Sequence, residues 1–521
     1  MRIETKDRQR IEDIIGEVLR IADDLTSFQR MLRSSISDNK LPFPSKVEIL
    51  SVYRKLIEEG KLERKDFLES FLLKKEMRTL SGVAPIAVFT KPFPCPGTCV
   101  YCPDEKGIPK SYIHNEPAVM RAEENRYDPH KQVSARLRHY REMGHPTSKV
   151  ELIVMGGTFS YLPRRYQTWF IKRCFDALNG IEAKGIEEAQ RLNEKASNRC
   201  VGLTVETRPD LINEEELKRF RRLGVTRVEI GVQSLYDDVL ILNKRGHSTK
   251  EVREATRLLR DAGFKVTYHM MLNLLGSDKE KDVKQFEILF NDPAYRPDYL
   301  KIYPCVLTPY AELRRYWERG EWIPYTDEEL LEVLTKIKAL VPIYVRIIRV
   351  IRDIPADQIL AGSKMSNMRQ VLQKMVKCRC IRCRQATSAP LNWEDIELFR
   401  LDYSASNGHE VFLSFESKDR EILYAFLRLR RVGEGLVKKW TGAEAVIREV
   451  HTYGPLVPIH QRDVLAVQHF GLGRKLLREA ERIAREEFGA RRIAVIAGIG
   501  AREYFEKAGY YLLRTYMVKD L

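Results

Sequence analysis

Between residues 79 and 363 the chain alternates short apolar runs with amphipathic stretches, and this alternation restricts the possible fold more than any other feature. The runs that have the length and composition of buried strands are residues 85–92, 149–157, 201–209, 226–234, 264–272, 298–304 and 343–350. Helical spacing of apolar residues recurs between them, at 167–178, 213–224, 250–263 and 282–290. Strands that alternate with helices form parallel βα units, so this region predicts a complete or partial TIM-like barrel.

The regions on either side of the barrel have different patterns. Residues 1–78 place apolar residues three and four positions apart, as in RIEDIIGEVLRIADDL, and predict a small helical module. Residues 364–397 form a basic linker with a cysteine cluster, and residues 398–521 are rich in strands before one clear helix and strand. A chain of 521 residues is too long for one core. We therefore expect an α/β protein with a helical N-terminal module, a barrel and a C-terminal α+β domain.

Cysteine usage predicts metal ligation. The clustered cysteines among the nine are Cys95, Cys99, Cys102, Cys378, Cys380 and Cys383. The first residues, MRIETKDRQR, are charged and do not resemble a secretory signal, which argues against a disulfide framework. No run of about 18 apolar residues occurs, so we expect no membrane span and a cytoplasmic location. Clustered thiols in such a chain favour a metal over disulfides.

The first cluster lies in the loop KPFPCPGTCVYCPDEKG, directly after the first predicted strand. Active sites of βα barrels lie at the carboxyl ends of the strands, so a cofactor held by this loop would be well placed. Three thiolates can hold zinc with a fourth ligand, or three irons of a 4Fe–4S cluster with one iron left open. These residues by themselves allow both interpretations.

Other predicted strands end in residues that suit a bound cofactor. Gly156 and Gly157 follow the second strand, where glycine lets the backbone approach a ligand closely. Glu206 ends the third strand and could accept hydrogen bonds from ribose hydroxyls, and Gln233 ends the fourth. Each feature is ambiguous alone. Because the carboxyl ends of parallel strands meet on one face, together they predict a single cofactor site.

The segment QHFGLG, residues 468–473, opens an amphipathic helix. A glycine-rich entry exposes backbone N–H groups at the positive end of the helix dipole, which is typical of a pyrophosphate site. With the strand at 491–497 and the helix at 501–508, the segment resembles GNAT acetyltransferases. That resemblance implies acetyl-CoA as co-substrate, with Tyr504 offering its phenol to it. The residues that it assigns to the acetyl-CoA site are Arg448, Glu449, Val450, His451, Gln468, Gly471, Leu472, Gly473 and Tyr504.

The net charge of +16 predicts a polyanionic partner, and nucleic acid is the first candidate. Residues 341–384 hold ten Lys/Arg and two Asp/Glu, which is half of the excess. We expect this stretch to face an RNA backbone, and a merely solvated face is the alternative. For the adjoining Cys378, Cys380 and Cys383 we predict a structural zinc with an unlocated fourth ligand; a second iron–sulfur cluster is the alternative.

The combined motifs resemble a known family. The cysteine loop after a barrel strand resembles the radical S-adenosylmethionine superfamily, and its fusion to a GNAT domain resembles the Elongator catalytic subunit and its single-chain archaeal and bacterial relatives. The segments that carry this resemblance are RTLSGVAPIAVFTKPFPCPGTCVYCP, RYDP, KVELIVMGGTFSYLP, VGLTVETRPD, RVEIGVQSLYDDVL, RDIPA, CRCIRC and QHFGLG. Two features depart from it. HMMLNLLGS at 269–277 replaces the expected HMMPGLPGS, and the first cysteine gap is shorter than in several relatives.

The resemblance implies an enzyme that places a carboxymethyl group on carbon 5 of wobble uridine 34 in tRNA. It implies a 4Fe–4S cluster on Cys95, Cys99 and Cys102, and an external electron donor. Cleavage of S-adenosylmethionine would yield a radical that activates the methyl of acetyl-CoA for addition to uridine, and thioester hydrolysis would follow. By family position Lys149 would contact acetyl-CoA as a catalytic residue, beside Tyr504.

The implied partner is the tRNA anticodon stem-loop, with the N-terminal module contributing to its binding. A protein lysine acetyltransferase with a structural iron–sulfur domain is the second hypothesis, and a non-catalytic RNA-binding subunit is the third. The complete cysteine triad disfavours the third. The sequence leaves self-association and accessory subunits open.

Overall fold

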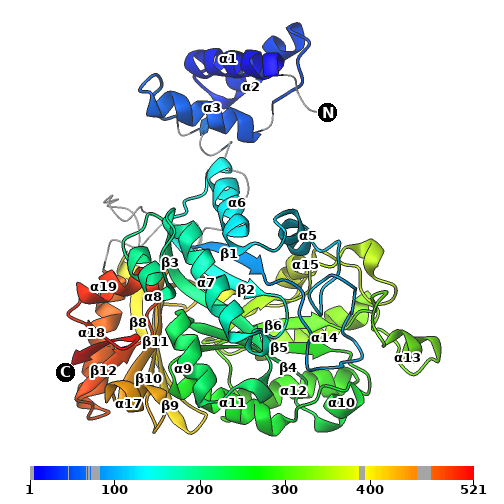
Figure 1. Ribbon diagram of the computed structural model, residues 1–521, viewed down its shortest axis with the longest axis vertical. Coiled ribbons are helices and arrows are strands. Elements are labelled where there is room, and N and C mark those ends of the chain that lie inside the picture. The colour runs from blue at the N-terminus through cyan, green and yellow to red at the C-terminus, as the bar shows by residue number, and fades with distance from the viewer. Residues whose placement is uncertain are drawn as a thin grey trace.

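The computed structural model describes residues 5–44, 46–65, 67–68, 71, 82–386, 393–453 and 471–521. Two seven-stranded sheets form the body of the molecule, and three N-terminal helices lie apart from it (Figure 1). Within the described residues, no helix is both long enough and apolar enough to span a bilayer.

The first sheet is the predicted partial barrel. All its strands are parallel and follow chain order from β1 to β7, and the described residues of β1 and β7 do not pair. The strands are β1 (Ala84–Phe89), β2 (Lys149–Met155), β3 (Arg199–Thr207), β4 (Arg227–Gln233), β5 (Lys265–Leu272), β6 (Tyr299–Pro304) and β7 (Arg346–Arg349). The helices that cover its outer face in Figure 1 include α6 (Pro129–Glu142), α7 (Arg164–Asn179), α9 (Glu214–Leu223), α11 (Thr249–Asp261), α12 (Lys279–Asn291) and α14 (Asp327–Leu340). One face of the sheet is covered by helices and the other faces the barrel interior, so neither faces open solvent, which explains the largely apolar runs in the sequence.

Shorter helices lie in the connections of the barrel and in the segment that follows it. They are α5 (Pro117–Glu124), α8 (Ile186–Asn193), α10 (Asp237–Leu242), α13 (Arg314–Glu318), α15 (Met368–Met375) and α16 (Ile381–Arg384).

The second sheet comes from the C-terminal residues. Its strands are β8 (Ile396–Ala405), β9 (Gly408–Ser417), β10 (Leu423–Arg431), β11 (Ala445–Thr452), β12 (Arg492–Val495), β13 (Tyr511–Leu513) and β14 (Tyr516–Asp520). Its helices are α17 (Leu436–Thr441), α18 (Leu472–Glu486) and α19 (Arg502–Glu506). All strand pairs are antiparallel except β11 with β12. This mixed sheet with helices confirms the expected α+β character of the region.

The N-terminal module consists of α1 (Thr5–Ile21), α2 (Leu25–Asp38) and α3 (Lys46–Glu58), with a small core of its own. The sequence predicted the helical module but not its middle helix. Asp24 starts that helix with a capping box, in which its side chain accepts from the Ser27 N–H. Arg54 on α3 donates to the Arg141 carbonyl on α6, so the module contacts the barrel at its first long helix.

Buried charges join the two sheets. Asp298, the residue before β6, accepts a hydrogen bond from Arg448 on β11 at 2.6 Å and lies 3.7 Å from Arg260 on α11. Glu410 on β9 accepts from both of these arginines and from Arg430 on β10. The side chains of all five residues are at most 1% exposed. A buried charge is tolerated only when it is paired, so each domain supplies the counter-charges that the buried groups of the other domain need.

Asp298 is ionised in this network. Burial alone would raise the pKa of Asp298, but Arg448, Arg260 and Arg428 outweigh that effect and hold the pKa below its ordinary value. A carboxylate is therefore present to balance the arginines throughout the neutral pH range.

Removing this carboxylate charge is expected to destabilise the contact between the domains. Asp298→Asn leaves Arg448 and Arg260 with less compensation, which should cost about 3 kcal/mol in the free energy of unfolding. Urea unfolding followed by circular dichroism measures this change. Glu332→Gln is the control, because it removes only an exposed pair with Lys336 and should leave the midpoint unchanged. Equal stability of the two variants would show that the network does not hold the domains together.

Candidate active site

One cavity of about 1720 Å³ runs through the barrel interior and continues to the second sheet. Its walls include residues at the carboxyl ends of the barrel strands, such as Gln233, and residues at their amino ends, such as Lys149. The sequence-predicted site residues that line it are Cys95, Cys99, Cys102, Lys149, Gly157, Glu206, Gln233, Arg448, Glu449, Val450, His451, Gly471, Gly473 and Tyr504. Gly156 and Leu472 do not line the cavity, and Gln468 lies outside the described residues.

Two arginines lie against the cysteine loop at the carboxyl edge of the barrel. Arg245 Nη1 lies 3.5 Å from Cys99 Sγ, within hydrogen-bond range of sulfur. A Cβ placed on Gly97 would lie 2.5 Å from Arg208 Nη1 and 3.6 Å from Cys99 Sγ, so only glycine lets this arginine approach the loop. Sequence reasoning missed both arginines, because only the fold brings them to the loop.

The turn after β2 and the end of β4 have the features of a ligand cradle. Gly156 and Gly157 have φ angles of 124° and 98°, and a Cβ on Gly156 would clash with Thr90 Oγ1. Gln233 also has a positive φ, 72°. The side-chain oxygens Gln233 Oε1 and Thr90 Oγ1 are buried and have no hydrogen-bond partner among the described residues. Orphaned buried oxygens beside a close backbone turn fit a polar ligand that supplies the missing donors.

A charged cluster occupies the barrel interior between the two ends of the cavity. Glu206 accepts from Tyr112 Oη at 3.0 Å and from Lys301 Nζ at 3.3 Å. Lys301 also pairs with Glu229, which lies 2.8 Å from His269 Nε2. Burial opposes ionisation of Glu229, but Lys301 and His269 outweigh it and lower its pKa. Side-chain oxygen and nitrogen atoms of Glu206, Glu229 and His269 lie within 4.8 Å of one another, which is close enough to bind a metal ion. The Lys301 ammonium, which pairs with both carboxylates, already supplies the positive charge that a metal ion would bring.

At the amino edge of the barrel, Lys149 begins β2 and burial lowers its pKa. His451 on β11 lines the same end of the cavity, where burial lowers its pKa to about 4. The Nε2 atom of His451 is buried without a described partner. Glu449 accepts from Tyr299 Oη and from Arg428 Nε, and the Arg448 side chain is committed to Asp298 and Glu410. A ligand here would therefore meet the backbone of Arg448 and Glu449 more readily than their charges.

The N-terminus of α18 opens beside Tyr504. Gly471 is its N-cap residue, with a φ of 69°, and within the described part of the chain no side chain caps the first N–H groups of the helix. A Cβ on Gly473 would lie 2.8 Å from Tyr504 Oη. Nearby, β11 pairs with β12 only from Ala445 to Ile447, and its remaining residues continue without that neighbour. The end of β12 thus leaves residues 448–452 of β11 without a described parallel neighbour, near the N-terminus of α18.

The segment 269–277, where the sequence departs from the expected HMMPGLPGS, is stabilised by Asn273. This residue has a φ of 58°, and its carbonyl accepts from Trp322 Nε1 at 2.8 Å. Its side-chain oxygen accepts from the Tyr325 N–H, and its own N–H donates to Asp282. The loop lacks the two expected prolines, and hydrogen bonds to residues 322–325 hold it in position instead. His269 and Met271 at its start line the cavity, and Asn273 does not.

Comparison with known proteins identifies the family. A model of the radical SAM superfamily matches residues 94–287, and one of the Radical_SAM C-terminal domain matches residues 297–377. The tRNA uridine(34) acetyltransferase of Methanocaldococcus jannaschii is 44% identical, covering 99% of this chain and 95% of that protein. Elongator complex protein 3 of Homo sapiens is 42% identical and covers 86% of each chain. The chain belongs to the Elongator complex protein 3 family.

A solved structure of this family has the same fold. Archaeal Methanocaldococcus infernus Elp3 with an N-terminal deletion of residues 1–46 is 44% identical and matches with a TM-score of 0.74. The match covers 85% of this chain and all of that one. Membership of the radical SAM superfamily implies a 4Fe–4S cluster and S-adenosylmethionine, and confirms the resemblance that the motifs carried.

The residues at the carboxyl edge fit these two groups. Three cysteines on one loop leave one iron of a 4Fe–4S cluster open, and Arg208 and Arg245 balance the negative charge of thiolates. The loop cysteines do not form a described group whose ligand atoms lie within 4.8 Å of one another. Sulfurs around a single tetrahedral zinc would be about 3.8 Å apart, given a Zn–S bond of about 2.3 Å, so the wider spacing suits a cluster.

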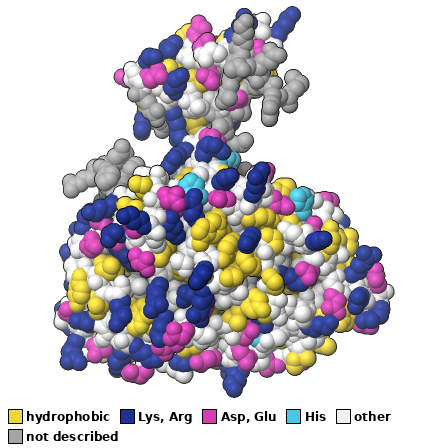
Figure 2. Space-filling view, viewed as in Figure 1, with side chains coloured by type: hydrophobic (Ala, Val, Ile, Leu, Met, Phe, Trp, Pro, Cys, Tyr) yellow, Lys and Arg dark blue, Asp and Glu magenta, His cyan; other side chains and the backbone are white. Residues whose placement is uncertain are grey.

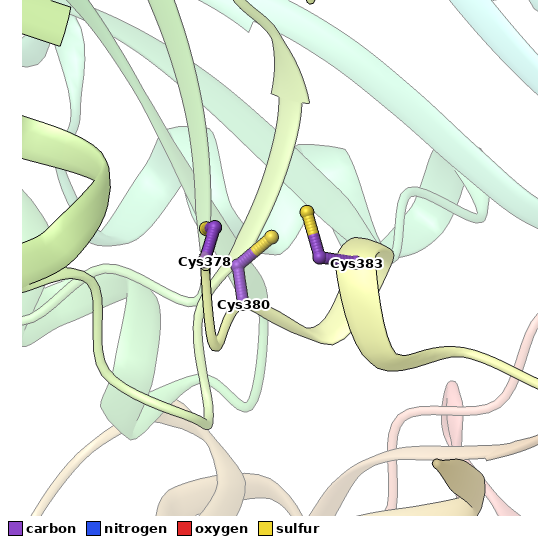
Figure 3. A group of neighbouring side chains, drawn as sticks. All are labelled: Cys378, Cys380 and Cys383. Carbon is purple, nitrogen blue, oxygen red and sulfur yellow. The ribbon is translucent and has the colours of Figure 1, made fainter. Parts of the chain in front are cut away.

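In the second cysteine group, by contrast, the sulfur atoms lie close together. The Sγ atoms of Cys378, Cys380 and Cys383 lie within 4.8 Å of one another, and Figure 3 shows Cys378 and Cys380 on the segment before α16 and Cys383 on that helix. Cys378 and Cys380 are buried. These three cysteines do not line the cavity, although Arg382 and Gln385 beside them do.

We expect the loop cysteines to hold the iron–sulfur cluster. Cys95→Ala, Cys99→Ala and Cys102→Ala should each abolish the visible charge-transfer band after anaerobic reconstitution, because each removes one of only three protein ligands. Cys174→Ala is the control, since that buried thiol packs in the apolar core away from the loop. Iron analysis and absorbance measure the result. A full band in a variant that lacks all three loop cysteines would place the cluster elsewhere.

Proposed function

We propose that this chain modifies wobble uridine 34 of tRNA, using S-adenosylmethionine radical chemistry and acetyl-CoA to form 5-carboxymethyluridine. The observation that carries the proposal is the single cavity that connects the cysteine loop, through the barrel interior, with Gly473 and Tyr504. The names of the acetyltransferase relatives support the same nucleoside as substrate.

When bound, the cluster and S-adenosylmethionine supply one-electron chemistry that can activate an unreactive C–H bond, which no side chain provides. In this proposal Cys95, Cys99 and Cys102 hold the cluster. The backbone at Gly156 and Gly157, with Gln233 Oε1, binds and orients S-adenosylmethionine. Glu206 shares its carboxylate between Tyr112, Lys301 and a ribose hydroxyl, so it reaches the ligand already oriented by two protein donors. An electron donor outside the chain completes the system.

The second sheet acts as a GNAT domain in this proposal and holds acetyl-CoA. The uncapped N-terminus of α18 at Gly471, Leu472 and Gly473, together with Gln468, would bind the pyrophosphate through backbone N–H groups. β12 ends at Val495, and in this proposal the pantetheine arm lies along residues 448–451 of β11, which have no described parallel neighbour. Tyr504 and Lys149 are the catalytic candidates. Burial raises the pKa of Tyr504 and lowers that of Lys149.

Cys378, Cys380 and Cys383 hold a structural zinc in this proposal. Their sulfurs gather closely enough for one tetrahedral ion, and α16 and the turn before it join the barrel to the second sheet.

The domain boundaries at residues 78, 363 and 397 stay predictions. So do the cytoplasmic location and the contact of the N-terminal module and residues 341–384 with tRNA. Of the linker cations, Arg382 already donates to the Ile348 carbonyl and Lys377 pairs with Glu421.

The proposed reaction is tested by mass spectrometry of nucleosides from tRNA incubated anaerobically with reconstituted protein. Carboxymethyluridine should form only when both S-adenosylmethionine and acetyl-CoA are present. Gly473→Glu should reduce product at least tenfold, because its side chain would meet Tyr504 and place a carboxylate where the pyrophosphate binds. Glu486→Gln, at the exposed far end of α18, should be neutral. Acetylation of protein lysines without any need for tRNA would support the acetyltransferase hypothesis instead.

The zinc assignment is tested separately. Metal analysis should find one zinc per chain in the wild type, and Cys380→Ala should lose it, because a site with three known thiolates does not tolerate removal of one. Cys95→Ala should keep its zinc while it loses iron. Iron in place of zinc at this triad would favour a second cluster.

A further inference from the structure

A second, shallow depression lies outside the central cavity, on α7 and the segment before α8. It has a volume of about 460 Å³, and basic side chains form most of its rim: Arg164, Arg165, Lys172 and Lys184. Trp169, which is 44% exposed, lies among them, and no acidic residue lines it. Figure 2, seen from the side on which α7 faces the viewer in Figure 1, shows Lys and Arg side chains among hydrophobic ones on this part of the surface. We call this feature the α7 depression.

The cations of the α7 depression are largely unneutralised. The side chains of Arg164, Arg165 and Lys184 form no ion pair with any residue in the described part of the chain. Lys172 shares Asp176 and Glu182 with a neighbouring arginine. Free guanidinium groups beside an exposed indole form a surface that suits a phosphate next to a flat ring.

An aromatic track links the depression to the cysteine loop. The ring of Trp169 lies 5.5 Å from that of Tyr166, which lies 5.0 Å from that of Phe93. Phe93 stands two residues before Cys95. Lys91 Nζ lies 5.1 Å from the centre of the Phe93 ring and 5.3 Å from that of Tyr166, so a cation accompanies the rings. The track thus runs from the surface to the carboxyl edge of the barrel, where the cavity holds the loop cysteines.

We propose that the α7 depression binds an unpaired nucleotide of the RNA substrate. Its base stacks on Trp169, and the neighbouring phosphates pair with Arg164, Arg165 and Lys184. The inference rests on the proposed function, since an RNA that places one base in the cavity must lie across its rim. A hollow with one central ring fits a single flat base. An acidic redox protein would need a broader face, of up to about 600 Å² on each partner.

The experiment measures binding of a synthetic tRNA anticodon stem-loop to the full-length protein, by fluorescence anisotropy over a series of salt concentrations. Arg164→Glu with Arg165→Glu should weaken binding at least tenfold and flatten the slope of log affinity against log salt by about 1.5, for two lost phosphate contacts. Trp169→Ala should weaken binding roughly tenfold with the salt slope unchanged, and Trp169→Phe should restore most of it.

The chain offers a matched control on α13. That helix also carries two adjacent arginines and a partly exposed tryptophan, in Arg314, Arg315 and Trp317. Arg314→Glu with Arg315→Glu, and Trp317→Ala, should leave both the affinity and the salt slope as in the wild type. Thermal unfolding of each variant separates a loss of binding from a loss of folding. Equal losses on α7 and α13 would show only a general charge effect and overturn the proposal.

Two further outcomes separate this proposal from the proposed function. If the wild type modifies tRNA and the α7 variants bind and modify it normally, the depression is not an RNA site and the proposed function stands. If the wild type does not bind the stem-loop at all, the proposed function falls as well. A third outcome is that the α7 variants keep their RNA affinity but an acidic flavodoxin reduces their cluster more slowly. That result would assign the depression to the electron donor and overturn the proposal.

Discussion

Buried arginine side chains form ion pairs with Asp298 and Glu410 where the barrel joins the second sheet. The rest of the site depends on this contact. Neither carboxylate could stay ionised in such a place without cations, and none of Arg260, Arg430 and Arg448 could be buried without carboxylates. The charges come from both domains, so a rotation of one sheet against the other would leave several buried charges without a partner. The network therefore fixes β11 against the amino ends of the barrel strands.

That docking places two chemical functions at opposite ends of one chamber. The cysteine loop follows the carboxyl end of β1, whereas Lys149, His451 and Tyr504 gather at the amino edge. β2 spans the seven residues between these edges, which is about 20 Å at roughly 3.3 Å per residue. The chamber between them is lined by the paired charges of Glu229 and Lys301 together with apolar side chains such as Ile153. In the proposed function, the long and flexible arm of the co-substrate reaches from one end toward the other.

Much of this architecture followed from local patterns, and the exceptions have physical causes. Short apolar runs predicted all seven barrel strands, and such runs are clearest where a strand is buried on both faces, as in β3 and β4. The helix α2 was missed, since its polar middle contributes only Phe28, Leu32 and Ile36 to the core. Arg448 matched a family position for a ligand contact, yet its guanidinium is committed to Asp298 and Glu410. Arg208 and Arg245 had no pattern that could reveal them.

The sequence by itself determined which ligating groups are present and which elements carry them. Three cysteines within eight residues and a glycine-rich entry to a helix are local facts, and the chemistry of thiolates and free N–H groups follows from them directly. Only the tertiary structure decided that these groups open into one cavity from opposite edges of the barrel. Asp298 and Arg448 are 150 residues apart, and hydrophobic periodicity states which face of an element is buried but not which distant element covers it.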